Sequence, residues 1–268
     1  MAVLRPAESV RVPVTVEPEI PFLAVDVETV ALRAEEAPRA VVDYLLGGRS
    51  SLTALHPAFG RVVCVAFCDP AGAVESRTAL GPEDERDLLE FFWGRLEAAG
   101  RAKLVTWNGR RFDVPFVQVR SLVRGVRWKV ELDLRGNRSL QDTNLVDLME
   151  LFAPGLAEFR WIPQELAAHL LGVEVAPAPA GRDIESLVRE GDAEGVRRRC
   201  ERDARLTAEL FLRVRALLPF GLQEPATPKQ LDYLRQLLQR RGQPVDEQWL
   251  AGLSRAEASA EIDRLQNR

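Results

Sequence analysis

Four acidic residues lie in or beside apolar segments, where burial of an unpaired charge would destabilise the fold. Asp26 and Glu28 interrupt the apolar run FLAVDVET, and their i, i+2 spacing on a strand places both side chains on one face. Asp203 falls inside the apolar stripe of a long helical pattern, and Asp113 ends the segment NGRRFD. A buried group of carboxylates is destabilising unless a cation compensates it, so these side chains could bind hard divalent metal ions.

Each acid also has an ordinary structural interpretation. Glu28 could lie just beyond the end of the strand, in solvent, and Asp113 could be the N-cap of a helix entered through Pro115. Asp203 could pair with one of the nearby arginines, which are Arg197, Arg198, Arg199, Arg202 and Arg205. A strand, a loop and a late helix all supply acids, and this convergence favours one shared site.

The elements around these acids alternate between strand and helix patterns. Apolar runs predict buried strands over residues 22–27, 61–68 and 103–107, and a turn at Pro70 and Gly72 predicts a hairpin partner over 73–80. Alternating valines predict a half-buried edge strand over 10–16. Helical patterns cover residues 82–100, 114–123, 161–171 and 192–218. The alternation is typical of an α/β domain.

Two stretches follow no strand pattern. Residues 126–141 have a weak pattern that predicts a hairpin or an irregular insertion, and the sequence from Asn144 onward is predicted to be mostly helical. After a break at 219–225, Thr227 and Ser254 begin capping-box patterns, which predict two or three short helices. We therefore expect a main domain over 1–220 and a small all-α C-terminal module over 226–268 that could bind a protein partner.

Composition excludes several classes of protein. Hydrophobic residues make up 46% of the chain and charged residues 28%, which is unlike a disordered protein. The formal net charge of −4 argues against non-specific nucleic-acid binding through overall charge, although 33 of 36 basic residues are arginines that could form a local basic surface. The three cysteines form no CxxC pair, which favours a reducing cytoplasmic location, and no run reaches the roughly 18 apolar residues of a membrane span.

The segments FLAVDVET, NGRRFDVPF and CERDARLT, in this order, resemble the three motifs of the DEDD (DnaQ-like) 3′–5′ exonucleases. The chain is most similar to predicted exonucleases related to the proofreading domain of family B DNA polymerases, over approximately residues 22–218. LHPAFGRVVCVAF and LVDLMELF resemble the family's intervening segments. The resemblance implies an α/β, ribonuclease H-like fold with a mixed five-stranded sheet flanked by helices.

By motif match, the resemblance implies that Asp26, Glu28, Asp113 and Asp203 are catalytic residues that bind two Mg²⁺ or Mn²⁺ ions. Two such ions roughly 3.5–4 Å apart can stabilise the attacking and leaving oxygens of an in-line displacement. The implied reaction hydrolyses the 3′-terminal phosphodiester and releases a nucleoside monophosphate.

Three further residues are candidates for substrate binding. The resemblance implies that Asn108 and Phe112 grip the terminal nucleotides, although a turn asparagine and a core phenylalanine are the ordinary interpretations. Arg199 stands where the family has a tyrosine or histidine that orients or deprotonates the attacking water. A guanidinium stays protonated and cannot act as a base. Arg199 could instead bind the scissile phosphate or pair with Asp203.

The expected function is therefore a metal-dependent 3′–5′ exonuclease on single-stranded DNA 3′ ends, serving DNA repair or replication. Retention of all four acids favours this activity. The substitution at Arg199 favours a catalytically silent nucleic-acid-binding module of the same fold. An exonuclease that acts on RNA is a third possibility, and it differs only in substrate.

Overall fold

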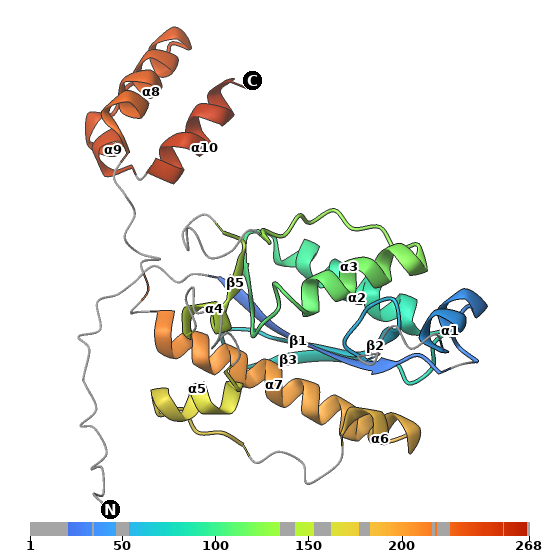
Figure 1. Ribbon diagram of the computed structural model, residues 1–268. Coiled ribbons are helices and arrows are strands. Elements are labelled where there is room, and N and C mark those ends of the chain that lie inside the picture. Colours follow the sequence, from blue (N-terminus) through green and yellow to red (C-terminus); the bar gives the residue numbers. More distant parts are fainter. Residues whose placement is uncertain are drawn as a thin grey trace, which may run out of the picture.

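Five strands form one mixed sheet in the computed structural model of the protein (Figure 1), with the order β3-β2-β1-β4-β5. The structure describes residues 21–33, 35–46, 54–134, 143–152, 162–176, 183–215, 218, 226–253 and 255–266. The strands are β1 (Phe22–Ala31), β2 (Gly60–Cys68), β3 (Val74–Thr78), β4 (Lys103–Thr106) and β5 (Leu145–Asp147). β1 pairs antiparallel with β2 and parallel with β4, and β5 extends the parallel side. This is the predicted ribonuclease H-like sheet.

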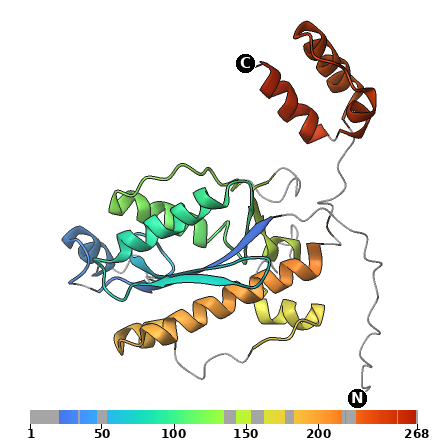
Figure 2. The same ribbon diagram turned by 180° about the vertical axis from the view of Figure 1, so that it is seen from behind.

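Helices cover both faces of the sheet (Figures 1 and 2). The first seven helices are α1 (Arg39–Leu46), α2 (Glu85–Ala99), α3 (Asp113–Arg124), α4 (Leu148–Phe152), α5 (Gln164–Leu171), α6 (Ile184–Arg189) and α7 (Ala193–Val214). α2 and α3 lie on one face, and α5, α6 and α7 lie on the other. No helix in the described part of the chain is long and apolar enough to cross a membrane.

The two faces of β1 contribute to two different apolar clusters. Leu23 and Val25 pack in the cluster that includes the apolar side chains of α2 and α3. Phe22 and Ala24 pack in the cluster that includes those of α7. Because side chains alternate along a strand, Asp26 and Glu28 continue the α7-facing row. The α7 face of β1 is therefore the face on which the acids lie.

Most predicted strands and helices are confirmed, with small shifts at their ends. β1 is longer than the predicted 22–27 and runs to Ala31, with an irregular register between Glu28 and Thr29. Glu28 therefore lies within the strand, and the interpretation that it follows the strand end is wrong. The helix predicted over 82–100 begins at Glu85 and is followed by Gly100, whose φ is +60°.

The prediction of mostly helical structure after Asn144 is wrong at its beginning, because β5 completes the sheet there. Three residues are too few to show a period, and the parallel pairing of Leu104 with Leu145 is a long-range contact. Residues 126–134 contain no regular element in the described part of that segment. The strand predicted over 10–16 and residues 135–142 lie outside the described residues.

The C-terminal helices have their own apolar cluster. They are α8 (Pro228–Arg240), α9 (Glu247–Gly252) and α10 (Arg255–Gln266). Leu234, Leu250 and Leu265 belong to a cluster drawn only from residues 226–265. The capping box at Thr227 is confirmed, because Thr227 and Gln230 exchange side-chain and backbone hydrogen bonds. The second predicted box begins at Ser254, outside the described residues.

Candidate metal centre

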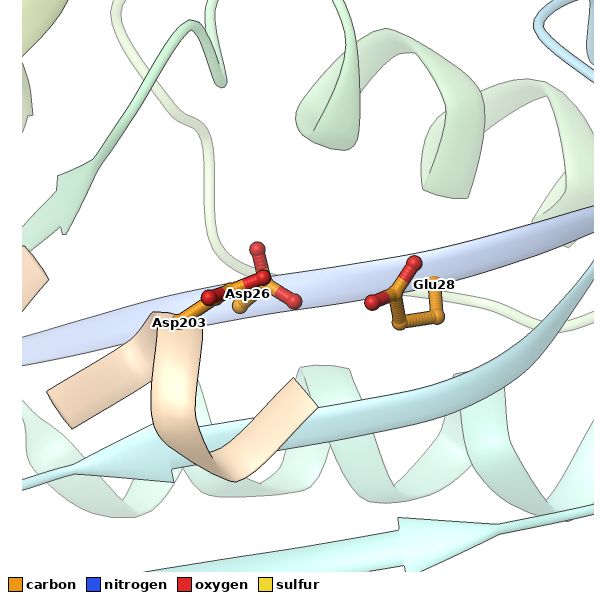
Figure 3. A group of neighbouring side chains, drawn as sticks. All are labelled: Asp26, Glu28 and Asp203. Carbon is orange, nitrogen blue, oxygen red and sulfur yellow. The ribbon is translucent and has the colours of Figure 1, made fainter. Parts of the chain in front are cut away.

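Three of the predicted acids meet on the α7 face of the sheet. Asp26 and Glu28 from β1 and Asp203 from α7 each offer an oxygen, and these oxygens all lie within 4.8 Å of one another (Figure 3). The Cys200 thiol donates a hydrogen bond to the backbone carbonyl oxygen of Asp26 at 3.3 Å. That contact holds α7 against β1, and Asp203 follows Cys200 by about one helical turn. The local packing therefore places the third carboxylate over the other two.

Asp113 lies beside this group rather than inside it. It is the buried first residue of α3, whose N-cap is Phe112, so the interpretation of Asp113 as the N-cap is wrong. β1 pairs with β4 only from Phe22 to Ala24, and the backbone of Val27, further along β1, forms a hydrogen bond with Asp113. The structure thus brings the fourth acid within electrostatic range of Asp26 and Glu28.

Burial and mutual repulsion oppose ionisation of the acids on β1. Burial raises the pKa of Asp26 well above its usual value, and the charges of Glu28, Asp203 and Asp113 raise it further. Burial raises the pKa of Glu28 to about 7, although the nearby Arg199 opposes this shift. The buried Oδ2 atom of Asp26 accepts no hydrogen bond from the described residues. If Asp26 is ionised, the negative charge on this oxygen is therefore not stabilised by a hydrogen bond from the described residues.

Asp113 and Asp203 also have raised pKa values. Burial raises the pKa of Asp113 to about 8, and the charges of Asp147 and Glu28 add to the shift. Burial raises the pKa of Asp203 to about 6, against the lowering effect of Arg202 and Arg199. A divalent cation among these groups would reverse the balance by stabilising all of the ionised forms.

Two arginines of α7 are paired with acids of the group. The Nε atom of Arg199 lies 3.4 Å from Oε1 of Glu28, and a guanidinium nitrogen of Arg202 lies 2.8 Å from Oδ1 of Asp203. The predicted pairing of Asp203 with a nearby arginine is confirmed, and the partner is Arg202. Arg199 is 40% exposed, so its guanidinium lies beside Glu28 with part of its surface accessible to solvent.

The two nucleotide-binding candidates lie in the turn before α3 and at its start. Asn108 has a φ of +66°, in the left-handed region that asparagine tolerates better than most residues. The ring of Phe112 lies 5.5 Å from that of Phe116 and is partly buried against the core on the α2 and α3 side. Phe112 is therefore only partly buried, and its role in nucleotide binding stays a prediction.

Two residues that sequence reasoning missed position the site. Asp147 is fully buried at the end of β5, and its carboxylate accepts hydrogen bonds from the backbone N–H groups of Asn108, Arg110 and Met149. Gln164 of α5 donates to the backbone carbonyl oxygen of Asp203 at 3.2 Å. An aspartate ending the apolar run NLVD was a sequence signal for the first of these.

The donor set fits a hard divalent cation. All of the candidate ligands are carboxylates, which suit Mg²⁺ and Mn²⁺. Oxygens of Asp26, Glu28 and Asp203 lie within 4.8 Å of one another, and Asp26 has a buried oxygen without a hydrogen-bond donor among the described residues. An incoming cation would satisfy that oxygen.

Comparison with a solved structure supports the fold. The chain is similar to the family B DNA polymerase from the hyperthermophilic archaeon Pyrobaculum calidifontis, with a TM-score of 0.52 and 19% sequence identity. The similarity covers 92% of this chain and 29% of the polymerase, so the chain spans less than a third of that protein. Among curated proteins, none is significantly similar in sequence.

Comparison with protein families is more specific. Residues 55–253 match the family described as predicted 3′–5′ exonucleases related to the exonuclease domain of PolB. The matched residues include Asp113, Arg199 and Asp203 and extend into the C-terminal helices, whereas Asp26 and Glu28 precede them. The expected likeness is confirmed: the chain belongs to the family of predicted 3′–5′ exonucleases related to the exonuclease domain of PolB.

Proposed function

We propose that this protein is a metal-dependent 3′–5′ exonuclease that removes nucleoside monophosphates from single-stranded DNA ends. The observation that supports it most directly is the convergence of the carboxylates of Asp26, Glu28 and Asp203 in a chain of an exonuclease family. A buried group of acids with raised pKa values destabilises the folded chain when no cation is bound. A purely structural role for these acids is therefore disfavoured.

In this proposal Asp26, Glu28, Asp113 and Asp203 hold two Mg²⁺ or Mn²⁺ ions. Divalent cations in such sites supply positive charge for the attacking water and for the leaving oxygen. The bond between the terminal phosphorus and the 3′ oxygen of the preceding nucleotide breaks, and water supplies the new P–O bond. The acids orient the reacting groups and form no covalent intermediate.

Three residues bind the substrate in this proposal. Arg199 lies beside Glu28 and is 40% exposed, so its guanidinium can donate to a phosphate, but it cannot take a proton from water. Asn108 and Phe112 lie in the turn before α3 and at its start, and the accessible part of the Phe112 ring can stack on a base of any sequence. A single strand suits these contacts because its terminal bases are already unstacked.

A catalytically silent nucleic-acid-binding protein is the second candidate. Its support is Arg199, because no residue able to act as a base stands at that position of the third motif. Such a protein would bind single strands without shortening them. The same assay therefore tests both candidates.

The cellular setting belongs to the proposal as well. The likeness to a polymerase exonuclease domain suggests DNA repair or replication. The three cysteines are free and buried, which suits the reducing cytoplasm. The helices over 226–268 are proposed as a module that contacts a protein partner.

The test is digestion of a 5′-labelled single-stranded DNA with Mg²⁺ or Mn²⁺. We expect a ladder of shortened products from the wild type and from Asp43→Ala, a matched loss of an exposed carboxylate on α1. Asp26→Ala and Asp203→Ala should abolish the ladder. Bound but unshortened DNA with every protein would support the silent candidate, and preferential shortening of a matched RNA would redirect the proposal to RNA.

A further inference from the structure

The carboxylate group contains its own positive charges. Glu28 is paired with Arg199 and Asp203 with Arg202, and both arginines come from the α7 segment RRRCERDAR. Without a metal ion, these guanidinium groups partly neutralise the acids. The two pairs differ in the exposure of the arginine and in the distance between the charged atoms, and this difference suggests different roles.

Arg202 is built into the fold. Its side chain is 12% exposed, its Nε atom donates to the backbone carbonyl oxygen of Ala176 at 2.9 Å, and a terminal nitrogen donates to Glu165 at 3.0 Å. Moving Arg202 away from Asp203 would also disturb its hydrogen bonds with Ala176 and Glu165, and its guanidinium is nearly buried. Arg202 therefore connects α7 to α5 and to the segment at Ala176 whether or not a cation is bound.

Arg199 is more exposed to solvent than Arg202. Its side chain is 40% exposed, and its contact with Glu28 is longer, at 3.4 Å, than the 2.8 Å contact of Arg202 with Asp203. A partly exposed ion pair at this distance is weakened by solvent, so it contributes little free energy against a cation that binds the same carboxylate. Glu28 stays in place, since it lies within β1 and is only 16% exposed.

We propose that Arg199 is a resident counter-ion that competes with the divalent cation for Glu28 and thereby lowers the metal affinity of the site. This inference rests on the proposed metal-dependent function. A cation bound to Glu28 and the Arg199 guanidinium repel each other. Metal binding therefore weakens the pair of Arg199 with Glu28, beside the place proposed for the scissile phosphate.

The test is a Mn²⁺ titration of the whole chain, followed by the electron paramagnetic resonance signal of free Mn²⁺. Arg199→Gln removes the charge and keeps a polar side chain. Arg198→Gln is the matched control, because it removes the same charge from the adjacent position of α7, where the arginine pairs with Glu194 at 3.2 Å. Asp26→Asn identifies the carboxylate site as the place of binding.

We expect Arg199→Gln to bind Mn²⁺ about three- to tenfold more tightly than the wild type, in the range that a partly exposed ion pair supplies. Arg198→Gln should match the wild type. In chelator, Arg199→Gln should also unfold at a lower temperature than Arg198→Gln, because Glu28 has lost its neutralising partner.

The outcomes separate this inference from the proposed function. Binding that Asp26→Asn abolishes, with equal or weaker affinity in Arg199→Gln, overturns the counter-ion role alone. Equal tightening in Arg198→Gln also overturns it, because the effect would then be one of net charge. No specific Mn²⁺ binding by any of the four proteins overturns both the metal-dependent function and the counter-ion role.

Discussion

Asp26 of β1 and Asp203 of α7 present carboxylate oxygens within 4.8 Å of each other on one face of the sheet. Like charges at this separation in a largely buried site destabilise the folded chain unless a cation compensates them. Apolar packing of α7 on β1 sets this arrangement, and the Cys200 thiol adds a hydrogen bond to the backbone carbonyl oxygen of Asp26. The relationship has measurable consequences for stability as well as for catalysis.

Asp26→Asn should stabilise the metal-free protein. Burial and three neighbouring carboxylates raise the pKa of Asp26, so its ionised form is unfavourable in the folded state, and asparagine removes that charge. We expect Tm at pH 8 in chelator to rise by about 2–4 °C, the shift that about 1 kcal/mol produces in a domain of this size. Mn²⁺ should raise the Tm of the wild type more than that of the variant. A lower Tm in chelator would contradict this prediction.

Stability of the metal-free protein should fall as pH rises from about 4 to 8. Folding raises the pKa values of Glu28, Asp113 and Asp203 to about 7, 8 and 6, so the folded chain binds more protons than the unfolded chain in this window. The stabilisation is complete below the unfolded pKa values and is lost as pH passes the folded ones.

Thermal unfolding of the wild type and Asp113→Asn in chelator at several pH values measures this dependence. The variant should lose less Tm between pH 5 and 8, because one of the titrating groups is absent. Saturating Mg²⁺ should flatten the wild-type profile. Parallel profiles for the two proteins would show that Asp113 does not titrate as expected.

Asp147→Ala should damage both stability and activity. The carboxylate of Asp147 accepts hydrogen bonds from three backbone N–H groups, and two of these belong to the turn that leads to Asp113. Removing it leaves those donors unsatisfied, which costs about 2–3 kcal/mol. Urea unfolding should show a lower midpoint with an unchanged slope, and Asp43→Ala, an exposed substitution, should leave the midpoint unchanged. An unchanged midpoint in Asp147→Ala would rule out this positioning role.

Thr227→Ala should weaken only the C-terminal helices. Thr227 accepts a hydrogen bond from the backbone of Gln230 in the capping box of α8, and loss of such a cap costs about 1 kcal/mol. If residues 226–268 are a separate module, calorimetry should show two transitions, of which only one shifts. Exonuclease activity on single strands should be unchanged. A single transition that shifts as a whole would show that the two parts unfold together.

Much of the fold follows from local pattern. The apolar run that forms β1 predicts a buried strand, and Pro82 and Gly100 bracket the helix that becomes α2. Both signals act within a few residues, so they persist in the linear sequence. β5 has no such signal, because its three residues become a strand only through pairing with β4.

The acids themselves could also be predicted from the sequence. Asp26 and Glu28 share a face because side chains alternate along a strand, and Asp203 stands out because it interrupts an apolar stripe. Asp113 stands between a strand pattern and a helix pattern, and the resemblance to the family motifs added Asn108 and Phe112. Asp147 was missed because its partners are backbone N–H groups of a distant turn, which only the pairing of β4 with β5 brings near.

The linear sequence shows which residue types are available, including an arginine one helical turn before Asp203. It does not show their partners, and in the folded chain Arg199 lies beside Glu28 and Arg202 beside Asp203. Ion pairs depend on distances of a few ångströms between charged side chains. Those distances arise from the packing of α7 on β1, which the spacing of residues along the chain does not specify.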